Sequence, residues 1–186
     1  MATFKSPFFC FITSLIAKII NFVSTHQAWI SAPFGYVRIW SSSECITRVE
    51  LTASKVSSDS PLNKFAKEAQ EQIKAYLKNP AFKFDLPIAI NGSAYRKRVW
   101  NEIVNIPAGE TRTYGEIATL MGSSAIAVGG ACGDNGLPLL IPCHRVVGRS
   151  GLGGFMHSSV GFSLKVKWWL LNHECSVISE SYGFSE

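Results

Sequence analysis

The chain has 186 residues, of which 47% are hydrophobic and 17% are charged, and its formal net charge is +5. A chain of this length holds one ordinary domain or two small ones, and its composition excludes an intrinsically disordered protein. The modest positive charge permits a polyanionic partner such as nucleic acid without requiring one.

The cysteines do not form the pattern of a disulfide-stapled fold. There are five, at positions 10, 45, 132, 143 and 175, and none belongs to a C-x-x-C pair. An odd count without that spacing argues against a disulfide framework and against a structural zinc site. We therefore expect a reducing compartment, the cytoplasm, and no bound metal.

Residues 1–30 are predicted to be an apolar N-terminal extension. The run at 7–23 is the most apolar in the chain, but Lys18 and Asn21 interrupt it and it is short for a membrane span. A signal peptide or membrane anchor is the alternative, and no clear small-residue cleavage site supports it. We expect no membrane partner.

Residues 31–84 are predicted to form a small α/β domain that begins with a hairpin. Two runs rich in β-branched and aromatic residues lie at 35–40 and 45–51. The serine-rich segment 41–44 separates them, which is typical of two antiparallel strands joined by a turn.

A helix is predicted to follow the hairpin. Ser60 can cap it, and Pro61 suits the first helical position. Apolar residues then recur on one face until Asn79 and Pro80 end the helix. The next segment has no periodicity, so residues 85–92 are predicted to be a linker.

Residues 93–175 are predicted to be mostly helical, and residues 176–186 to be a tail. Within this region Thr113 and Glu116 have the spacing of a capping box, which starts a helix that Gly122 ends. Further helices are expected at the start of the region, after a cap at Ser93, and near its end, at 164–173.

A second short helix, predicted at 125–132 after Ser123 or Ser124, completes the outline of a helix-turn-helix. Its residues are nearly all alanine and glycine, and Gly129 and Gly130 each cost about 1 kcal/mol relative to alanine. A helix that accepts this cost must approach another surface closely. That surface is either a neighbouring helix or a narrow groove.

The stretch 141–148, IPCHRVVG, is the strongest candidate for chemistry. Pro142 fixes its own φ and favours an extended residue before it, so Cys143 is presented from a bend. Cysteine combines high nucleophilicity with a pKa that neighbours such as His144 can tune. The alternative is a buried structural cysteine beside a satisfied histidine, which is the commoner arrangement.

Four motifs in order decide between these interpretations: YGEIA at 114–118, AVGGA at 127–131, PCHRV at 142–146 and WLLNHE at 169–174. Together they resemble the O6-alkylguanine-DNA alkyltransferases, or methylated-DNA–protein-cysteine methyltransferases. The resemblance covers about residues 32–175. It implies a ribonuclease H-like α/β N-terminal domain and a mostly α C-terminal domain with a helix-turn-helix.

The resemblance also implies the activity. The second helix enters the minor groove of double-stranded DNA, and the alkylated guanine is flipped into a pocket. One irreversible step transfers the alkyl group from O6-alkylguanine, with O4-alkylthymine as an additional substrate, to cysteine. The protein is consumed, needs no cofactor and acts as a monomer.

Roles in this reaction follow from the matching positions. Cys143 is the alkyl acceptor, His144 deprotonates it through a water, and Glu174 orients the histidine. Asn135 holds the turn before the cysteine, and Tyr114 lies near the flipped base. The resemblance further implies DNA contacts from Ile126, Ala127, Gly130, Ala131, Thr113 and Arg145, and a substrate pocket formed by Val146, Val147 and Phe155. A structural ion pair is the alternative role for Arg145.

The sequence departs from the family pattern at three places. Ile126 stands where the family usually has an arginine that fills the space left by the flipped base. Gly136 stands where a proline usually follows the asparagine, and a longer loop at 156–163 replaces a short pocket loop. These changes affect delivery of the base and leave the nucleophile in place.

Two other functions remain as alternatives. A non-catalytic binder of alkylated DNA, like the alkyltransferase-like proteins, would fit if the departures had disabled transfer, although those proteins usually replace the cysteine. A Cys-His hydrolase would need a histidine across a cleft from Cys143. His26, His157 and His173 are the candidates for that role.

Overall fold

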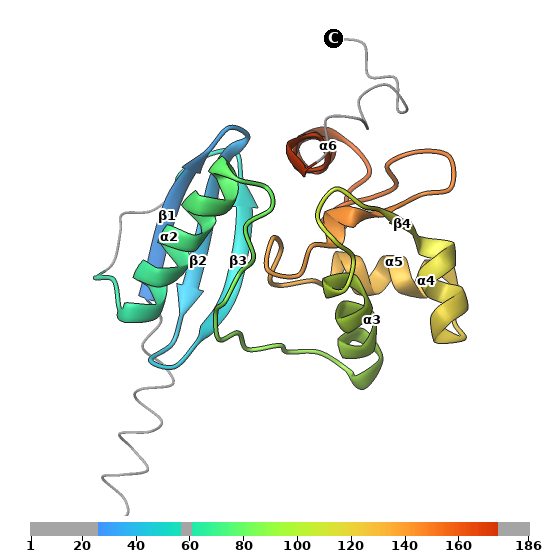
Figure 1. The fold of residues 1–186 in the computed structure, drawn as a ribbon, viewed down its shortest axis with the longest axis horizontal. Coiled ribbons are helices and arrows are strands. Elements are labelled where there is room, and N and C mark those ends of the chain that lie inside the picture. Colours follow the sequence, from blue (N-terminus) through green and yellow to red (C-terminus); the bar gives the residue numbers. More distant parts are fainter. Residues whose placement is uncertain (1–25, 57–60, 175–186) are drawn as a thin grey trace, which may run out of the picture.

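The computed structural model describes residues 26–56 and 61–174. Most of the predicted N-terminal extension, the predicted cap Ser60 and the predicted tail lie outside these residues. Figure 1 shows a small sheet with one helix across it, beside a larger helical part. The predicted order, an α/β part followed by a mostly helical part, is confirmed.

The sheet has three antiparallel strands in the order β1-β2-β3: β1 (His26–Ala32), β2 (Gly35–Ser41) and β3 (Ile46–Thr52). The predicted hairpin is β2 and β3, paired from Tyr36 opposite Thr52 onward. β1 crosses the expected boundary between the extension and the domain, so the sheet already begins at His26. The Trp29 and Ile30 side chains of β1 are buried, which explains why this strand belongs to the fold.

Helix α2 (Lys64–Lys78) covers one face of the sheet (Figure 1). It starts later than predicted, because its N-cap is Asn63 and not Ser60. The Asn63 Oδ1 accepts from the Ala66 amide at 2.8 Å, and its Nδ2 donates to the Ser42 carbonyl at 2.5 Å. Asn63 therefore caps the helix and fixes it to the turn after β2 at the same time.

The predicted linker at 85–92 is extended and hydrogen-bonded to the N-terminal part. The Ile46 amide donates to the Pro87 carbonyl, and the Ala89 amide donates back to the Ile46 carbonyl, both at 2.8 Å. Gln72 of α2 exchanges two 2.8 Å hydrogen bonds with the backbone of Asp85. The segment is thus attached to β3 and α2 before it crosses to the helical part (Figure 1).

The helical part begins as the cap signals predict. Ser93 caps the first helix and accepts from the Arg96 amide, and Ser124 caps the helix of small residues. Gly122 ends the helix before it with a φ of 59°, in the left-handed region that glycine tolerates. The elements are α3 (Ala94–Val104), β4 (Arg112–Thr113), α4 (Tyr114–Met121), α5 (Ala125–Gly133), the 3₁₀ turn η1 (Cys143–Arg145), β5 (Val146–Val147) and α6 (Gly161–Glu174).

The two parts share one continuous cluster of buried apolar side chains. Ile39 and Ile46 from the sheet belong to the same cluster as Ile103 and Leu170 from the helices. Phe34 packs edge-on against Trp169 of α6 with ring centroids 5.2 Å apart. Helix α6 is therefore held between the sheet and the remaining helices, as Figure 1 shows. Among the described residues, no helix is long and apolar enough to cross a membrane.

Replacing Thr113 by alanine should lower the free energy of unfolding by about 1 kcal/mol. In the predicted capping box, which the structure confirms, the Thr113 hydroxyl accepts from the Glu116 amide at 3.1 Å and the Glu116 carboxylate accepts from the Thr113 amide at 2.6 Å. Urea denaturation measures the loss. Thr119→Ala is the matched control, because this exposed threonine of α4 caps nothing. Equal losses in both variants would contradict the capping role.

Candidate active site

Cys143 is presented from a tight bend behind a buried apolar run. Leu139 has a φ of 74°, which is unusual for a leucine, and Pro142 turns the chain into η1. The Cys143 amide donates to the Ile141 carbonyl at 2.8 Å, which closes the bend. The cysteine is 3% exposed, so its thiol is inside the protein while it still borders a cavity.

The Asn135 side chain holds this bend. Its Nδ2 donates to the Ile141 carbonyl at 2.8 Å and to the Cys143 Sγ at 3.1 Å. Its Oδ1 accepts from the Leu137 amide at 2.9 Å. Gly136 stands where the family pattern has proline. A hydrogen bond from the Val49 amide of β3 to the Gly136 carbonyl, at 2.9 Å, restrains the backbone there. The turn is therefore fixed by hydrogen bonds at both ends.

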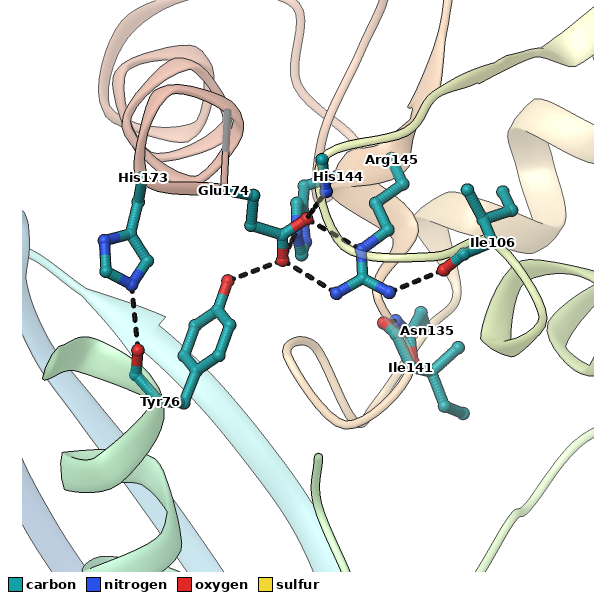
Figure 2. A network of polar contacts seen from close by, with 9 residues as sticks. Tyr76, Ile106, Asn135, Ile141, His144, Arg145, His173 and Glu174 are labelled. Carbon is teal, nitrogen blue, oxygen red and sulfur yellow. Dashed lines mark hydrogen bonds and ion pairs between the residues drawn. The ribbon is translucent and has the colours of Figure 1, made fainter. Parts of the chain in front are cut away.

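His144 points away from the cavity and towards a buried carboxylate. Its Nε2 lies 2.9 Å from the Glu174 Oε1, and both side chains are 1% exposed. Figure 2 shows this pair with Arg145, whose Nε and Nη2 each donate to the same carboxylate at 2.8 Å. The Cys143, His144 and Glu174 predicted from the motifs are thus brought together in one place.

The charges of this cluster reinforce one another. Burial raises the pKa of the Glu174 carboxyl, but hydrogen bonds and charge from His144 and Arg145 outweigh burial and hold that pKa well below its usual range. Burial lowers the pKa of His144, and Glu174 opposes this effect. The resting site is therefore a carboxylate beside a neutral imidazole. Because Nε2 carries the proton donated to Glu174, Nδ1 is left as the basic nitrogen.

Arg145 has a structural role, which corrects its predicted place among the DNA contacts. Its side chain is 13% exposed, and besides the two bonds to Glu174 its Nη1 donates to the Ile106 carbonyl at 2.6 Å. The donors of the guanidinium are directed into the protein. The alternative role, a structural ion pair, is the one the structure supports.

Lys167 of α6 is a buried cation that the sequence analysis missed. Its Nζ donates to the carbonyls of Val146 at 2.6 Å and Gly154 at 2.9 Å, and its side chain is completely buried. Burial lowers its pKa to about 8, and the nearby Cys143 and Cys132 thiols oppose that shift. The sequence does contain a sign that Lys167 is buried, because it shares a helical face with Leu164 and Leu171 at i−3 and i+4.

The Cys143 thiol is protonated in the resting site. Burial raises its pKa, while the hydrogen bond from Asn135 and the positive charge of Lys167 act in the opposite direction. A thiol in this state needs a base before it can attack, since the thiolate is the nucleophile. His144 is adjacent in the chain, and its Nδ1 has no hydrogen-bond partner among the described residues.

A cavity of about 450 Å³ lies over the thiol, between α5 and the segment that leads to α6. Val146 and Val147, predicted to form the substrate pocket, are not in its lining, because both side chains are buried among other apolar residues. Phe155 does line it. The lining is Tyr114, Ala125, Ile126, Gly129, Cys132, Gly133, Cys143, Gly154, Phe155, Met156, His157, Ser158 and Ser159.

Tyr114 borders the cavity with its hydroxyl held in place. The hydroxyl donates to the Gly154 carbonyl at 2.9 Å and lies 3.4 Å from the Lys167 Nζ. Burial raises the pKa of this phenol, so it remains protonated and able to donate. Tyr114 is therefore part of the cavity wall, and its position near the flipped base stays a prediction.

The longer loop forms a tight turn over one side of the cavity. Phe155 and Ser158 exchange backbone hydrogen bonds at 2.8 and 3.0 Å around Met156 and His157, which both have positive φ. The His157 Nε2 lies 2.9 Å from the Asp134 Oδ1, next to the end of α5. A Cβ on Gly133 would come within 2.6 Å of the His157 ring, so a glycine there allows the loop to sit against α5.

The outer face of α5 is nearly flat apart from one side chain. Ile126 is 89% exposed, Ala127 is half-buried and Gly130 is exposed. Ala131, predicted to contact DNA, is 2% exposed and faces the core, where its carbonyl accepts from the Trp100 Nε1 at 2.8 Å. Ala131 is therefore removed from the set of candidate DNA contacts, and Thr113 is the half-buried cap of α4.

Comparison with known proteins places these features in one family. The family model of the 6-O-methylguanine DNA methyltransferase DNA binding domain matches residues 94–176. A methylated-DNA–protein-cysteine methyltransferase of Methanosarcina acetivorans is 34% identical over 159 residues, which cover 81% of this chain and 99% of the relative. That of Mycolicibacterium paratuberculosis is 46% identical over 85 residues, or 45% of this chain and 52% of the relative.

Solved structures agree with the sequence relatives. The crystal structure of the Mycobacterium tuberculosis O6-methylguanine methyltransferase superposes with a TM-score of 0.69 at 32% identity, over 82% of this chain and 93% of that chain. The Mycobacterium tuberculosis OGT in complex with DNA gives a TM-score of 0.68 at 32% identity, over 81% of this chain and 93% of that chain.

The free energy of unfolding should fall as the pH drops from about 7 to about 5. Histidine has an ordinary pKa of about 6.5, and burial lowers that of His144 in the folded chain. The unfolded chain therefore takes up this proton first. The contribution of His144 to stability is complete above about pH 6.5 and is lost as the pH falls through the window below it. Urea denaturation at several pH values measures the slope.

His144→Asn should flatten that slope, because asparagine does not titrate. The same change at His157, whose side chain is 63% exposed, is the matched control and should leave the slope in place. A His144→Asn chain with the slope of the unchanged chain would contradict the assignment to His144.

Proposed function

The chain belongs to the family of methylated-DNA–protein-cysteine methyltransferases, and we propose that Cys143 is the residue that accepts the alkyl group. The family repairs alkylated DNA by direct reversal, and the transferase keeps the group. One observation carries the assignment to Cys143: the thiol borders a cavity of about 450 Å³, while the next residue, His144, is hydrogen-bonded to a buried carboxylate. The reaction needs no cofactor in this proposal.

The thiol loses its proton to His144 through a bridging water. Adjacent side chains in a 3₁₀ turn diverge, so direct transfer between Cys143 and His144 is unfavourable. The His144 Nδ1 is buried and has no hydrogen-bond partner among the residues that the structure describes. It is the nitrogen opposite the Glu174 bond, and the carboxylate stabilises the imidazolium that forms. Lys167 adds positive charge close to the thiolate.

The thiolate then attacks the alkyl carbon. A sulfur–carbon bond forms, the bond from that carbon to the guanine O6 breaks, and the electron pair leaves with the guanine. A proton must reach the leaving base, because an anionic leaving group raises the barrier. The Tyr114 hydroxyl borders the cavity and is the donor, and Lys167, 3.4 Å away, offsets the charge left behind.

DNA is the partner of this family, and the mode of binding is part of the proposal. Helices α4 and α5 act as a helix-turn-helix whose second helix enters the minor groove of the duplex. The exposed face of α5 carries little side-chain bulk, which suits a close approach. The target base leaves the stack and enters the cavity, since the thiol cannot reach it inside the duplex.

The remaining details follow the resemblance. The substrate is O6-alkylguanine, with O4-alkylthymine as an additional substrate, and the chain acts as a monomer in the cytoplasm. The N-terminal part is ribonuclease H-like. Ile126, with its 89% exposed side chain, acts as the apolar wedge that fills the space left by the flipped base.

The two alternative functions are less well supported. A non-catalytic binder would not need a cysteine between a base-sized cavity and a histidine–carboxylate pair. A Cys-His hydrolase would need a histidine facing Cys143, and His157 does line the cavity. Its Nε2 is engaged by Asp134, and no hydrogen bond joins it to Cys143 within the described residues. His173 is bonded to the Tyr76 carbonyl, and His26 to the Pro61 carbonyl.

Incubating the reduced chain with duplex DNA that contains O6-methylguanine should add one methyl group to the peptide that contains Cys143. Mass spectrometry of the digest measures the adduct. Cys143→Ser should show no adduct, whereas Cys132→Ser, which removes the other thiol of the cavity, should keep it. An intact, reduced chain without any adduct, or an adduct on Cys132, would contradict the assignment.

Replacing Ile126 by arginine should increase the rate of transfer roughly tenfold if the wedge limits base flipping, because a guanidinium can hydrogen-bond to the unpaired cytosine. Single-turnover kinetics on duplex DNA measures the rate. Leu120→Arg on α4 is the matched control, since Leu120 is 62% exposed and the variant adds the same charge elsewhere. Equal gains in both variants would show a general effect of charge on binding.

A further inference from the structure

We propose that Tyr76, in the helix of the N-terminal part, is a positioning residue of the alkyl transfer that acts through Glu174 on His144. This inference rests on the proposed function, because it assumes that His144 is the base for Cys143. It assigns the N-terminal part a chemical role in the reaction, through one hydroxyl group on α2.

The Tyr76 hydroxyl shares an acceptor with the catalytic histidine. It donates to the Glu174 Oε1 at 2.8 Å, and the His144 Nε2 donates to the same oxygen at 2.9 Å. Tyr76 is 1% exposed, so water does not compete with this contact. Figure 2 shows the phenol approaching the carboxylate from α2, on the side away from Arg145.

The phenol ring is fixed in this position. The Tyr76 carbonyl accepts from the His173 Nε2 at 2.8 Å, so α2 is joined to α6 one residue before Glu174. The ring also packs against His173 and Phe84, with centroids 5.3 and 5.4 Å away. Because backbone and ring are both held, the hydroxyl stays directed at the carboxylate.

Glu174 receives more donors than it has favourable acceptor positions. A carboxylate offers about four lone-pair sites, and Glu174 accepts five hydrogen bonds. Oε1 accepts from Tyr76, His144 and Arg145, and Oε2 accepts from Arg145 and from the Gly109 amide at 3.3 Å. Each additional donor withdraws negative charge from the bond to His144. Tyr76 therefore weakens the support that Glu174 gives to a protonated His144.

Three charged groups face His144, and only one of them, Glu174, is hydrogen-bonded to Tyr76. Glu174 raises the pKa of the imidazole, and Arg145 and Lys167 lower it, on top of the effect of burial. Tyr76 is neutral, because burial and then the Glu174 carboxylate beside it raise its pKa above the ordinary value for tyrosine, so it does not change charge in the working range. Its influence is exerted only through the hydrogen bond to Glu174.

Tyr76→Phe tests this role, because it removes the hydroxyl and keeps the ring. Without the competing donor, Glu174 should hold a protonated His144 more strongly. The acid limb of the pH–rate profile for single-turnover methyl transfer should then move up by roughly half a pH unit. The pKa of the His144 imidazole, measured by NMR titration in the full chain without DNA, should rise by the same amount.

Phe84→Leu is the matched control. It loosens the packing around the same ring and keeps the hydroxyl, so it should lower the melting temperature without moving the acid limb. A Tyr76→Phe profile that overlays that of the unchanged chain, with an unmoved His144 titration, would overturn the inference. The same would follow if Phe84→Leu moved the limb equally, since Tyr76 would then act only through packing.

Methyl transfer by the unchanged chain tests the proposed function separately from the role of Tyr76. If it transfers methyl groups to Cys143 while Tyr76→Phe behaves identically, only the role of Tyr76 is wrong. If the unchanged chain transfers nothing, the proposed function fails and the role of Tyr76 fails with it.

Discussion

The structure depends on one carboxylate that is buried and fully hydrogen-bonded. Removing a carboxylate from water costs several kcal/mol unless donors and opposite charge replace the solvent. The side chain of Glu174 is 1% exposed, and its donors come from α2, from the turn at Gly109 and from η1. These segments must meet at Glu174 for the charge to be tolerated. Folding therefore sets the orientation of His144 before any DNA is bound.

Helix α6 places a positive charge near Cys143 and a negative charge next to His144. Lys167 and Glu174 are seven residues apart on α6, which places them two turns apart on one face. Glu174 faces His144, which would become positive, and Lys167 acts on Cys143, which would become negative. The electric field of Lys167 and Glu174 favours the transfer of a proton from the Cys143 thiol to the His144 imidazole. A single rigid element thus prepares the separation of charge that the transfer requires.

The sequence allowed prediction of most features that depend on neighbouring residues, with the cap of α2 as an exception, because Asn63 caps that helix in place of the predicted Ser60. The caps at Ser93, Thr113 and Ser124 are local signals, and each begins a helix in the structure. The contacts of Tyr76 and Lys167 could not be predicted, because they depend on residues far away in the chain. Tyr76 and Glu174 are 98 residues apart, and nothing near either one indicates the other. Side-chain direction was equally hidden, so the sequence did not indicate that Val146, Ala131 and Arg145 face inward.

Two of the three departures from the family pattern, Ile126 and the longer loop, lie away from this charge network. Ile126 and His157 line the cavity from its outer side, on α5 and on the loop before α6, whereas Glu174 and His144 are buried behind the thiol. The His157 side chain contacts Asp134 at the end of α5, so the loop and the helix together form one wall of the cavity. A change in this wall would alter the shape of the cavity and leave the buried pair of His144 and Glu174 in place. In the proposed reaction, the fit of the base could therefore vary independently of the activation of Cys143.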